Sequence, residues 1–518
     1  MSEAPERCAL INVTDKTGVM ELAHGLAGLG FKIVASGATY TTLKQSELSV
    51  LQVQDLAASP DLLEGTLGLL HPRVLVGVSA DRDNPGQMHE LERRKAAAVD
   101  LVAVNLYPMA EITAERDLPL AELLAYVDVG SAGILRAAAR NFRHVIPLCD
   151  PDDYGPVLDS LRQYGRVLPE RRQALASKAF HYLAYYDTTV AQYLGSRRDR
   201  LPDEFVIGLK KAAEFPYGEN PQQQGALYSV SGSRPRGINA AQLVFGKPLS
   251  YNHYLDLEYA WELANELDQP SCVIAKHSVP AGVACAESLA EAARAAYRCD
   301  PRGGFRGTAA VNREVTDEAA AFFAEEYVTC IAAPAFSASA LEILKTKKDI
   351  RLVVLPPPVV AAHEFDFQAV AGGMLVQDRD NQPLFGDLKT VSRRAPDEAE
   401  LKSLRLAWLV AKAARTHAAV VCRGSATIGI GSGQTSRLDA ISIALAKSQE
   451  RHPILPPGQP LVLASDGPLS TEHLQAAAEG GITAFIESGG SAEDSDAAAF
   501  CDSRNLALVF TGTRHFKH

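Results

Sequence analysis

The stretch VIAKHSVPAG, residues 273–282, places Lys276 beside His277 at the end of a short apolar run. On a regular strand these side chains would point to opposite faces, so they can serve one site only if the strand ends there. Pro280 and Gly282 are expected to stop regular structure and to supply that end. An ammonium disfavours a charged imidazole beside it, which leaves a neutral general base next to a cation that can stabilise an oxyanion. The dipeptide alone leaves open the alternative of a solvated lysine beside a hydrogen-bonded histidine.

A second group of polar residues follows apolar runs in the first 150 residues. The turn of Ser36, Gly37, Ala38 and Thr39 precedes a helical pattern, and free N–H groups at such a turn suit a phosphate. Most turns of this kind only cap a helix, and spacing alone does not decide between the two. Asn105, Tyr107 and Asp128 would lie at the carboxyl ends of strands, where ligands of open parallel sheets collect. In the alternative reading, Asp128 caps a helix and Tyr107 packs under a loop.

The elements that must position these residues alternate between strand and helix patterns over the first 195 residues. We expect strands at 9–13, 31–35, 100–108 and 144–149, and helices at 17–30 and 127–141. Thr14 and Asp15 are candidate N-caps of the first helix. The pattern predicts an α/β fold with a doubly wound parallel sheet. A polar segment then suggests a domain over 1–196, a linker over 197–204, and a region over 205–518 with two similar α/β halves.

Bulk composition limits the partners. The 518 residues carry a formal net charge of −11, which argues against a nucleic-acid surface and favours a small-molecule partner. No apolar run is long enough to span a membrane and no leader pattern is present, so a cytoplasmic location is expected. The eight cysteines form no CxxC motif, so neither zinc nor another metal site nor a disulfide framework is expected.

Twelve stretches occur in an order typical of one family. They are NVTDKTG, VASGAT, NLYP, LRAAARN, YGENPQQ, LSYN, KHSVPAG, APAF, ALEILKTKK, GGMLVQDRD, GIGSGQTSR and VFTGTRHFKH. The chain resembles the purine-biosynthesis family that joins aminoimidazole-carboxamide ribotide (AICAR) formyltransferase to inosinate (IMP) cyclohydrolase. The resemblance implies a methylglyoxal-synthase-like domain followed by two cytidine-deaminase-like halves without zinc. It also implies a homodimer with formyltransferase sites at the subunit interface, 10-formyltetrahydrofolate as co-substrate, purine ribotide substrates and a possible monovalent cation.

The resemblance also assigns roles to residues. It makes His277 the base that deprotonates the aromatic amine, and Lys276 the group that assists the oxyanion or the departing folate nitrogen. It places two further catalytic positions at Tyr107 and Asp128, and His417 is a candidate catalytic residue that stands where the family has an asparagine. The positions expected to bind the ribotide are Tyr217, Asn252, Arg437, Arg514 and Phe516 in the formyltransferase region, and Lys16, Thr17, Ser36, Gly37, Thr39, Asn105 and Arg140 in the first domain.

The chain departs from the family pattern within the motifs. Where the family has G-R-V-K-T-L-H-P, this chain has GTLGLLHP, so the loop Arg, Lys and Thr are Thr66, Gly68 and Leu69. Other departures are Ala38, Arg140, Pro216, Gln222, Thr416, His417, Arg306 and the segment SDGPLST at 465–471. Three interpretations follow: a divergent bifunctional enzyme in which His417 or Arg306 compensates, a formyltransferase without cyclohydrolase activity, and a non-catalytic paralogue that binds purine nucleotides.

Overall fold

The computed structural model describes residues 7–59, 68–115, 118–195, 201–232, 234–358, 365–382, 388–451 and 459–518. Contacts divide the chain into two compact units. The first contains Met1–Lys211 and Tyr228–Arg234, and the second contains Ala212–Leu227 and Pro235–His518. Of the expected linker, 197–200 lie outside the described residues and 201–204 belong to the first unit.

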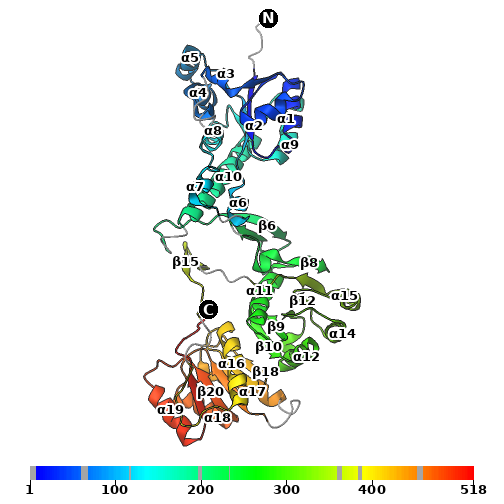
Figure 1. The fold of residues 1–518 in the computed structure, drawn as a ribbon, viewed down its shortest axis with the longest axis vertical. Helices are drawn as coiled ribbons and strands as arrows, with labels where there is room; N and C mark the ends of the chain where they lie inside the picture. Colours follow the sequence, from blue (N-terminus) through cyan, green and yellow to red (C-terminus); the bar gives the residue numbers. More distant parts are fainter. Residues whose placement is uncertain are drawn as a thin grey trace. The chain divides into compact units, whose positions relative to one another are not determined.

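The first unit is built on a five-stranded sheet in the order β3-β2-β1-β4-β5, with every neighbouring pair parallel. The strands are β1 (Arg7–Val13), β2 (Phe31–Ala35), β3 (Val50–Gln52), β4 (Leu101–Asn105) and β5 (Ile146–Leu148). Two hydrophobic clusters use alternate residues of the same strands, with Leu10 in one and Ile11 in the other. Because successive strand residues point to opposite faces, helices cover both faces of the sheet, as Figure 1 shows. The expected doubly wound parallel sheet is confirmed.

The helices of this unit follow the βαβ order that the sequence predicts. They are α1 (Val19–Gly28), α2 (Gly37–Lys44), α3 (Val53–Ala57), α4 (Pro72–Ser79), α5 (Pro85–Arg93), α6 (Met109–Glu115), α7 (Leu120–Leu124), α8 (Val129–Arg140), α9 (Tyr154–Tyr164) and α10 (Pro169–Gly195), with short 3₁₀ turns η1 (Gly68–Leu70) and η2 (Pro151–Asp153). Outside both large sheets, a separate two-stranded ribbon pairs β6 (Leu209–Phe215) with β7 (Gly225–Val230).

The expected N-caps of α1 are wrong. The residue before the helix is Gly18, which has φ 66°, a left-handed conformation that glycine adopts without a Cβ penalty. The Asp15 carboxylate instead accepts hydrogen bonds from the N–H and the hydroxyl of Thr17, at 2.9 and 2.7 Å. Thr14 and Asp15 therefore shape the loop ahead of the helix and leave its end uncapped by a side chain.

The second unit is built on a twelve-stranded mixed sheet in the order β16-β21-β20-β19-β17-β18-β10-β9-β11-β12-β13-β8. Its strands are β8 (Gln242–Phe245), β9 (Ser271–Lys276), β10 (Val279–Cys285), β11 (Thr308–Val311), β12 (Cys330–Ala333), β13 (Arg351–Val354), β16 (Lys389–Thr390), β17 (Ala419–Arg423), β18 (Ala426–Gly431), β19 (Leu461–Ser465), β20 (Ile482–Glu487) and β21 (Ala507–Phe510). A separate ribbon pairs β14 (Phe365–Val370) with β15 (Gly373–Asp378).

The strand order of this sheet repeats. Outward from the central pair of β10 and β18, one side reads β9, β11, β12, β13, β8 and the other reads β17, β19, β20, β21, β16. Each strand of one half thus has a counterpart at the same position and in the same chain order in the other half. The expected duplication of two α/β halves is visible in this topology.

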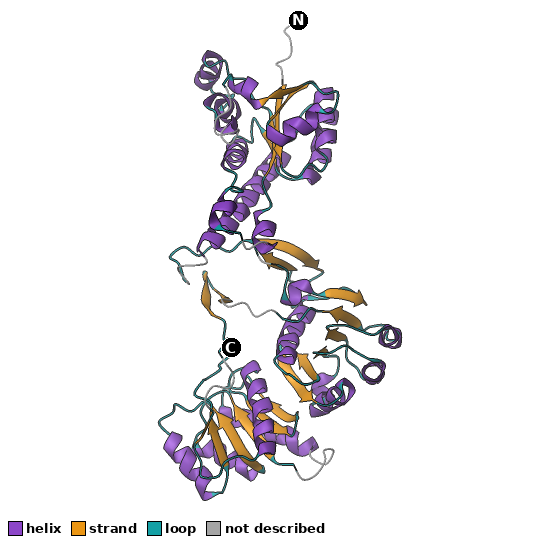
Figure 2. Cartoon of the chain, viewed as in Figure 1, coloured by secondary structure: helices purple, strands orange, loops and turns teal. Residues whose placement is uncertain are grey.

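Helices occupy matching positions in the two halves, and Figure 2 shows them beside the strands. They are η3 (Gly237–Ala240), α11 (Tyr251–Asn265), α12 (Leu289–Cys299), α13 (Pro301–Gly304), α14 (Asp317–Glu325) and α15 (Ala338–Leu344), then α16 (Glu398–Ala413), α17 (Arg437–Arg451), α18 (Thr471–Glu479) and α19 (Asp494–Ser503). The buried side chains of α11 and α16 share one hydrophobic cluster that runs across both halves. All eight cysteines are free thiols, and no helix among the described residues has the length and apolarity to cross a membrane.

Candidate functional sites

The Lys276–His277 pair lies where the chain turns from β9 into β10. Val279 pairs with Lys276, so His277 and Ser278 form a two-residue hairpin turn, with φ values of 59° and 56°. Two positive φ values are typical of a type I′ turn, a conformation that costs side-chain-bearing residues free energy. Pro280 does not end regular structure as expected, because it lies within β10 beside an irregularity in the pairing. The strand ends after Lys276 because the chain reverses, which leaves His277 exposed at the tip.

Asp256 on α11 holds this turn in place. Its Oδ1 accepts a hydrogen bond of 2.7 Å from the N–H of Ser278. Burial raises the pKa of Asp256, while backbone hydrogen bonds from Ser278 and His277 and the charge on His277 oppose that rise. A carboxylate that accepts N–H donors stabilises a turn whose φ values are otherwise costly. The sequence interpretation missed Asp256, which lies one helical turn after the predicted Asn252.

The other predicted residues of this group surround the same corner. The Lys276 ammonium donates to the carbonyl of Phe305 at 2.9 Å, and Arg306 follows with φ 60° and an exposed side chain. Asn252 donates from Nδ2 to the carbonyl of Glu219 at 3.3 Å, which ties α11 to the segment that follows Tyr217. Tyr217 itself is 40% exposed. We call Lys276, His277, Asn252 and Asp256 the lysine–histidine group.

A second group lies at the ends of β19 and β17, around the fully buried Asp466. The Asp466 carboxylate accepts hydrogen bonds from the Thr416 hydroxyl at 2.8 Å, the Ala418 N–H at 3.0 Å and the Arg437 guanidinium at 3.1 Å. Burial lowers the pKa of Arg437, and Asp466 opposes that shift. His417 has φ 55°, and its Nδ1 is buried without a hydrogen-bond partner among the described residues. The Arg437 guanidinium also donates to the Pro468 carbonyl, so most of its hydrogen-bonding capacity is taken up by Asp466 and Pro468.

Phe516 and Arg514 complete this second group from the C-terminal segment. The Arg514 guanidinium lies 4.7 Å from the centre of the Phe516 ring, in cation–π geometry. A Cβ at Gly467 would lie 2.9 Å from Cε1 of Phe516 and 2.9 Å from Nη2 of Arg437, so the glycine permits this close approach. Both Arg514 and Phe516 have exposed side chains, available to a ligand. We call Asp466, Arg437, Arg514 and Phe516 the arginine group.

Glu487, at the end of β20, is a buried acid near the arginine group. Its Oε2 accepts from the N–H of Leu469 at 3.1 Å, whereas its Oε1 is buried without a hydrogen-bond partner among the described residues. Burial raises its pKa to about 7. The sequence interpretation did not single out Glu487, although an acid closing the apolar run ITAFIE was a usable signal.

The two groups lie on one edge of the sheet but not together. The strands from β9 through β10, β18 and β17 to β19 are successively antiparallel, so β9 and β19 point the same way and end at the same edge. They are four strand positions apart, roughly 19 Å at the usual spacing. Within one chain, the lysine–histidine group and the arginine group therefore lie too far apart to contact the same reacting atoms.

In the first unit, predicted residues meet between the carboxyl ends of β1 and β4, where the strand order reverses. The buried Asn105 accepts from the N–H groups of Thr14 and Asp15 at 2.5 and 2.9 Å and donates to the Asp15 carbonyl at 3.1 Å. Lys16 donates to the carbonyl of Val13 and to the Thr39 hydroxyl. Burial lowers the pKa of Lys16. This reversal point is where open α/β sheets bind ligands.

The predicted phosphate turn opens α2. Ser36 occupies the N-cap position of α2, but its hydroxyl makes no capping hydrogen bond and donates to Asn12 Oδ1 at 2.8 Å instead. Asn12 in turn donates to Ser131 at 2.9 Å, which links the starts of α2 and α8. Since no side chain caps α2, the N–H groups of its first turn have no capping acceptor from Ser36, and the predicted phosphate site there stays a prediction. Gly37 and Thr39 belong to the helix and not to the turn before it.

Asp128 and Tyr107 lie near this edge, and Arg140 does not. Asp128 caps α8, with Oδ1 accepting from the Ser131 N–H at 2.7 Å, so the capping alternative is correct for one carboxylate oxygen. Tyr107 is 41% exposed and meets Tyr126 edge-on at 5.7 Å, so it is not packed under a loop. Arg140 lies in the last turn of α8, roughly 18 Å from Asp128 along the helix axis.

The departures at 66–69 remove polar groups from the loop before α4. Thr66 lies outside the described residues. Leu69 is 4% exposed and packs in a hydrophobic cluster of the first unit. A Cβ at Gly68 would lie 3.1 Å from Cγ1 of Val53, so this backbone also lies close to the core. Neither Gly68 nor Leu69 can supply the amine or hydroxyl that the family pattern has there.

One cluster of possible metal-ligating residues is present among the described residues, although no metal site was expected. Asp81, Asp83 and His144 bring their ligand atoms within 4.8 Å of one another. His144 Nε2 lies 3.0 Å from Asp81 Oδ1, and Arg143 lies 3.5 Å from Asp83. Charge pairs of this kind also occur in ordinary surface clusters that hold no metal ion.

Comparisons with known proteins agree across nearly the whole chain. A family model described as "AICARFT/IMPCHase bienzyme" matches residues 138–447, and an "MGS-like domain" model matches 18–132. The "Bifunctional purine biosynthesis protein PurH" of Persephonella marina is 38% identical over 99% of this chain and 100% of its own length. The protein of that name from Anoxybacillus flavithermus is also 38% identical, over 99% and 100%. A crystal structure of ForH, 37% identical, covers 37% of this chain and all of its own, with a TM-score of 0.34.

Proposed function

The chain belongs to the AICARFT/IMPCHase bienzyme family, and from this premise we propose which of its residues carry the family's two reactions. It is an enzyme of de novo purine biosynthesis with AICAR formyltransferase and IMP cyclohydrolase activities. Its substrates are purine ribotides, and 10-formyltetrahydrofolate is the co-substrate of the first reaction. The observation that carries the residue assignment is the hairpin turn at Lys276 and His277, held by Asp256.

We assign formyl transfer to the lysine–histidine group. His277, exposed at the tip of the turn, accepts the proton that the aromatic amine loses as its nitrogen bonds to the formyl carbon. The bond between the formyl carbon and the folate nitrogen then breaks, and Lys276 gives that nitrogen a proton. One proton transfer from His277 to Lys276 resets the pair. Asn252, one turn before Asp256 on α11, is positioned to orient the ribotide beside them.

We assign ribotide recognition to the arginine group. Arg514 is exposed, and its guanidinium suits a phosphate. The Phe516 ring, 44% exposed, offers a flat surface to the heterocycle. Arg437 and Asp466 hold each other, which fixes the base of this surface. His417, which lies beside the arginine group between Thr416 and Ala418, can donate or accept a proton near the transferred carbon, from a backbone with positive φ.

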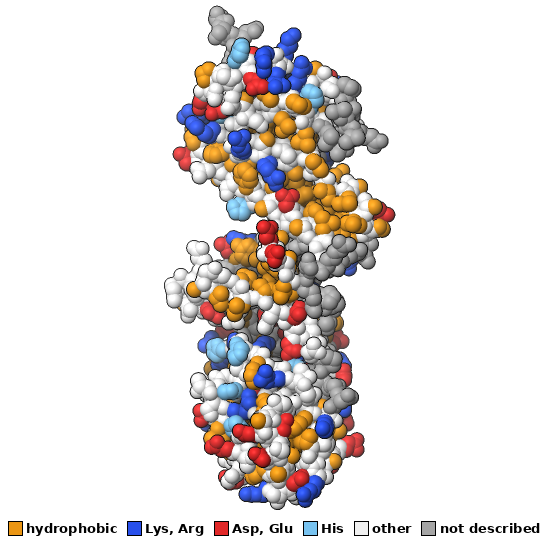
Figure 3. Space-filling model, turned by 90° about the vertical axis from the view of Figure 1, so that its left-hand side faces the viewer, with side chains coloured by type: hydrophobic (Ala, Val, Ile, Leu, Met, Phe, Trp, Pro, Cys, Tyr) orange, Lys and Arg blue, Asp and Glu red, His pale blue; other side chains and the backbone are white. Residues whose placement is uncertain are grey.

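We propose a homodimer, in which the arginine group of one chain meets the lysine–histidine group of its partner. Support comes from the separation of roughly 19 Å between the two groups within one chain, at the usual strand spacing. Exposed apolar side chains support it as well. Phe367, Met374 and Leu375 lie exposed on the β14–β15 ribbon, and Leu120 and Leu124 lie exposed on α7. Figure 3 shows that hydrophobic side chains gather in patches on the face that it draws. Isolated two-stranded ribbons need such a partner.

We assign ring closure to the edge between β1 and β4. The N–H groups at the start of α2 would hold the ribotide phosphate. Asp128 has a carboxylate oxygen besides the one that caps α8, and Tyr107 presents an exposed hydroxyl, so both can bind the carboxamide and the formyl oxygen. The carboxamide nitrogen bonds to the formyl carbon, and the formyl oxygen leaves as water. Closure is intramolecular and is therefore favoured by proximity.

One observation favours a second candidate, formyl transfer without efficient ring closure. Gly68 and the buried Leu69 stand where the family has a lysine and a threonine. The test is to supply AICAR and 10-formyltetrahydrofolate and to measure folate release and IMP formation separately. Equal rates support the bifunctional assignment, and folate release without IMP supports the second candidate. Absence of both products would contradict both and favour a non-catalytic nucleotide-binding protein.

We also propose, from the family resemblance, that the protein binds a monovalent cation. Its test compares both activities in potassium chloride and in tetramethylammonium chloride at equal ionic strength. A loss of activity in the second salt, reversed by potassium, supports a bound cation, and equal rates in both salts would contradict it.

A further inference from the structure

Two of the twelve stretches typical of the family meet in the second unit. GGMLVQDRD ends with Asp380, two residues after β15, and VFTGTRHFKH contains His515 near the end of the chain. Nδ1 of His515 lies 2.6 Å from Oδ2 of Asp380. An ionised carboxylate can only accept a hydrogen bond, so His515 donates from Nδ1. The pair joins segments that are 135 residues apart in the sequence, and neither reaction assigned to the chain uses it.

His515 is a buried histidine between two exposed neighbours. It is 1% exposed, whereas Phe516 is 44% exposed and Arg514 is exposed as well. This alternation is typical of an extended chain, in which successive side chains point to opposite sides. His515 therefore faces inward where Arg514 and Phe516 face outward, with the Arg514 guanidinium 4.7 Å from the centre of the Phe516 ring. The orientation of His515 thus decides how both of these residues are presented.

The main chain around His515 is attached to the base of the arginine group at two points. The N–H of His515 donates to the Asp466 carbonyl at 3.4 Å, and the N–H of Thr416 donates to the Lys517 carbonyl at 2.8 Å. The first of these is longer than a typical N–H···O hydrogen bond. The side chain of His515 supplies a third attachment, which is charge-assisted because its acceptor is the Asp380 carboxylate.

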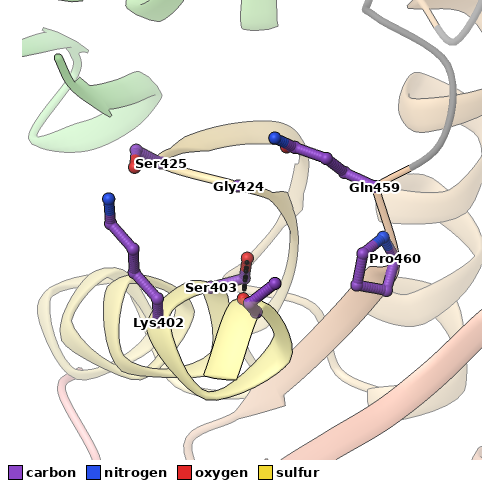
Figure 4. Close-up of a pocket in the computed structure, with 7 residues that line it drawn as sticks. Lys402, Ser403, Gly424, Ser425, Gln459 and Pro460 are labelled. Carbon is purple, nitrogen blue, oxygen red and sulfur yellow. Dashed lines mark hydrogen bonds between the residues drawn. The ribbon is translucent and has the colours of Figure 1, made fainter. Parts of the chain in front are cut away.

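Helix α16 supplies the apolar surface against which His515 packs. The ring of the fully buried Trp408 meets the His515 ring edge-on, with centroids 5.5 Å apart. The helix begins beside the surface hollow drawn in Figure 4, which Lys402 and Gln459 help to line, and it ends three residues before Thr416. Trp408 lies in the C-terminal half of α16, so His515 packs against the end of the helix that leads to the arginine group.

The segment that carries Asp380 is itself anchored to the first half of the unit. Its neighbour Arg379 forms an ion pair with Glu262 on α11, the helix that also carries Asn252 and Asp256. Nε2 of His515 is buried without a hydrogen-bond partner among the described residues. Loss of the Asp380 carboxylate would therefore leave both ring nitrogens of a buried side chain without a partner in that part of the chain, which costs free energy.

We propose that Asp380 and His515 are positioning residues for ribotide binding, and that their hydrogen bond holds the C-terminal segment in the conformation that presents Arg514 and Phe516 together. Without this hydrogen bond, His515 is no longer fixed inward and the segment populates other conformations. The affinity for the ribotide then falls in proportion to the fraction of chains that keep the competent conformation. The inference rests on the proposed assignment of ribotide recognition to the arginine group.

The test measures formyl transfer by the full-length protein, with AICAR varied and 10-formyltetrahydrofolate saturating. Asp380→Ala should raise KM for AICAR at least about tenfold, because a charge-assisted hydrogen bond is lost and a buried side chain loses its partner. kcat should be unchanged, since saturating AICAR restores the competent conformation. A merely structural role would instead lower kcat through loss of folded protein and leave KM as it is.

Glu342→Ala is the control for the loss of a carboxylate. It removes an exposed acid of the same unit that pairs with Lys345 at 2.8 Å on α15, and it should leave KM and kcat unchanged.

Substitutions of His515 test the hydrogen bond against packing alone. His515→Leu has a side chain that suits the apolar surroundings of Trp408 but has no donor, whereas His515→Asn keeps a donor near the position of Nδ1 in a smaller side chain. If the hydrogen bond positions the segment, KM for AICAR rises more in His515→Leu than in His515→Asn. The proposal is overturned if this order is reversed, or if a folded Asp380→Ala protein has the KM of the wild type.

Arg514→Met separates this inference from the assignment on which it rests. A rise in KM for AICAR in both Arg514→Met and Asp380→Ala supports both. A rise in Arg514→Met with no change in Asp380→Ala would overturn the positioning role alone. An unchanged KM in Arg514→Met would overturn the assignment of ribotide recognition, and the positioning role with it.

Discussion

Asp256→Asn is the change that most directly tests how the fold positions the proposed catalytic pair, Lys276 and His277. The asparagine keeps the size of the side chain but loses the charge that accepts the Ser278 N–H at 2.7 Å. A hydrogen bond to a charged group contributes about 1.5–3 kcal/mol. His277 and Ser278 both have positive φ, and a left-handed conformation costs about 1–2 kcal/mol for each such residue. The asparagine oxygen still accepts the Ser278 N–H, but as an uncharged and weaker acceptor, which offsets less of this cost.

The expected result is a fall in kcat for formyl transfer of about 5- to 10-fold, because a charged acceptor contributes about 1–1.5 kcal/mol more than a neutral one and every 1.4 kcal/mol corresponds to a factor of ten in the population of the competent turn. KM for AICAR should change little, because the arginine group is untouched. Adding S278G should recover about fivefold, because glycine adopts a positive φ without the Cβ penalty. Ring closure measured from supplied formyl-AICAR should be unchanged, which excludes general misfolding.

Glu258→Gln is the matched control, because it makes the same chemical change on the same helix and keeps an acceptor for the Ile238 N–H. The reasoning is refuted if a folded Asp256→Asn protein transfers formyl at the wild-type rate. It is equally refuted if Glu258→Gln loses as much activity.

Three further predictions follow from the other positions. His277→Ala should lower formyl transfer at least about a hundredfold, the scale of a general base, with ring closure from supplied formyl-AICAR as the internal control. Glu487→Gln should be more stable than the wild type at high pH. The folded-state pKa of about 7 exceeds the unfolded value of 4.5, so the wild type loses up to about 3 kcal/mol of folding free energy between pH 5 and 8.5, and the glutamine variant does not. Melting temperatures of wild type and variant that change in parallel at all pH values would contradict this. Gly68→Lys should raise the rate of ring closure without altering formyl transfer, and an unchanged ratio of IMP to released folate would show that the missing amine does not limit closure.

The sequence predicts the strands and helices of the first unit well, because these elements follow from patterns among neighbouring residues. Apolar runs such as LVAVN give buried parallel strands, and Asn105 follows at the strand end, where the fold places it at the edge between β1 and β4. Its role depends on contacts with Thr14 and Asp15, about ninety residues earlier in the chain. A polar residue after a strand can therefore be located from sequence, but whether it meets a ligand or the backbone is decided by tertiary contacts.

The sequence analysis missed residues whose role depends on a contact with another helix or strand. Asp256 looks like an ordinary helical acid, and only the return of β9 beside α11 brings it to the Ser278 N–H. Pro280 and Gly282 looked like strand breakers, but Pro280 pairs with Ala275 and Gly282 with Ile274, on either side of a local irregularity. The propensity of a residue is a weak guide where the tertiary pairing overrides it.

The two halves of the second unit differ in how their hairpin turns are supported. Both halves have the same strand order, a two-residue turn at the same position and a capped helix beside it, but only the first turn has a positive φ at both residues. In the first half, Asp256 accepts a hydrogen bond from the turn, so His277 can keep a costly conformation at an exposed tip. The second half has Ser403 in place of Asp256, and its turn begins with Gly424, for which a positive φ is not costly. The glycine and the missing carboxylate are thus consistent with each other, because a turn without strain needs no internal anion to hold it.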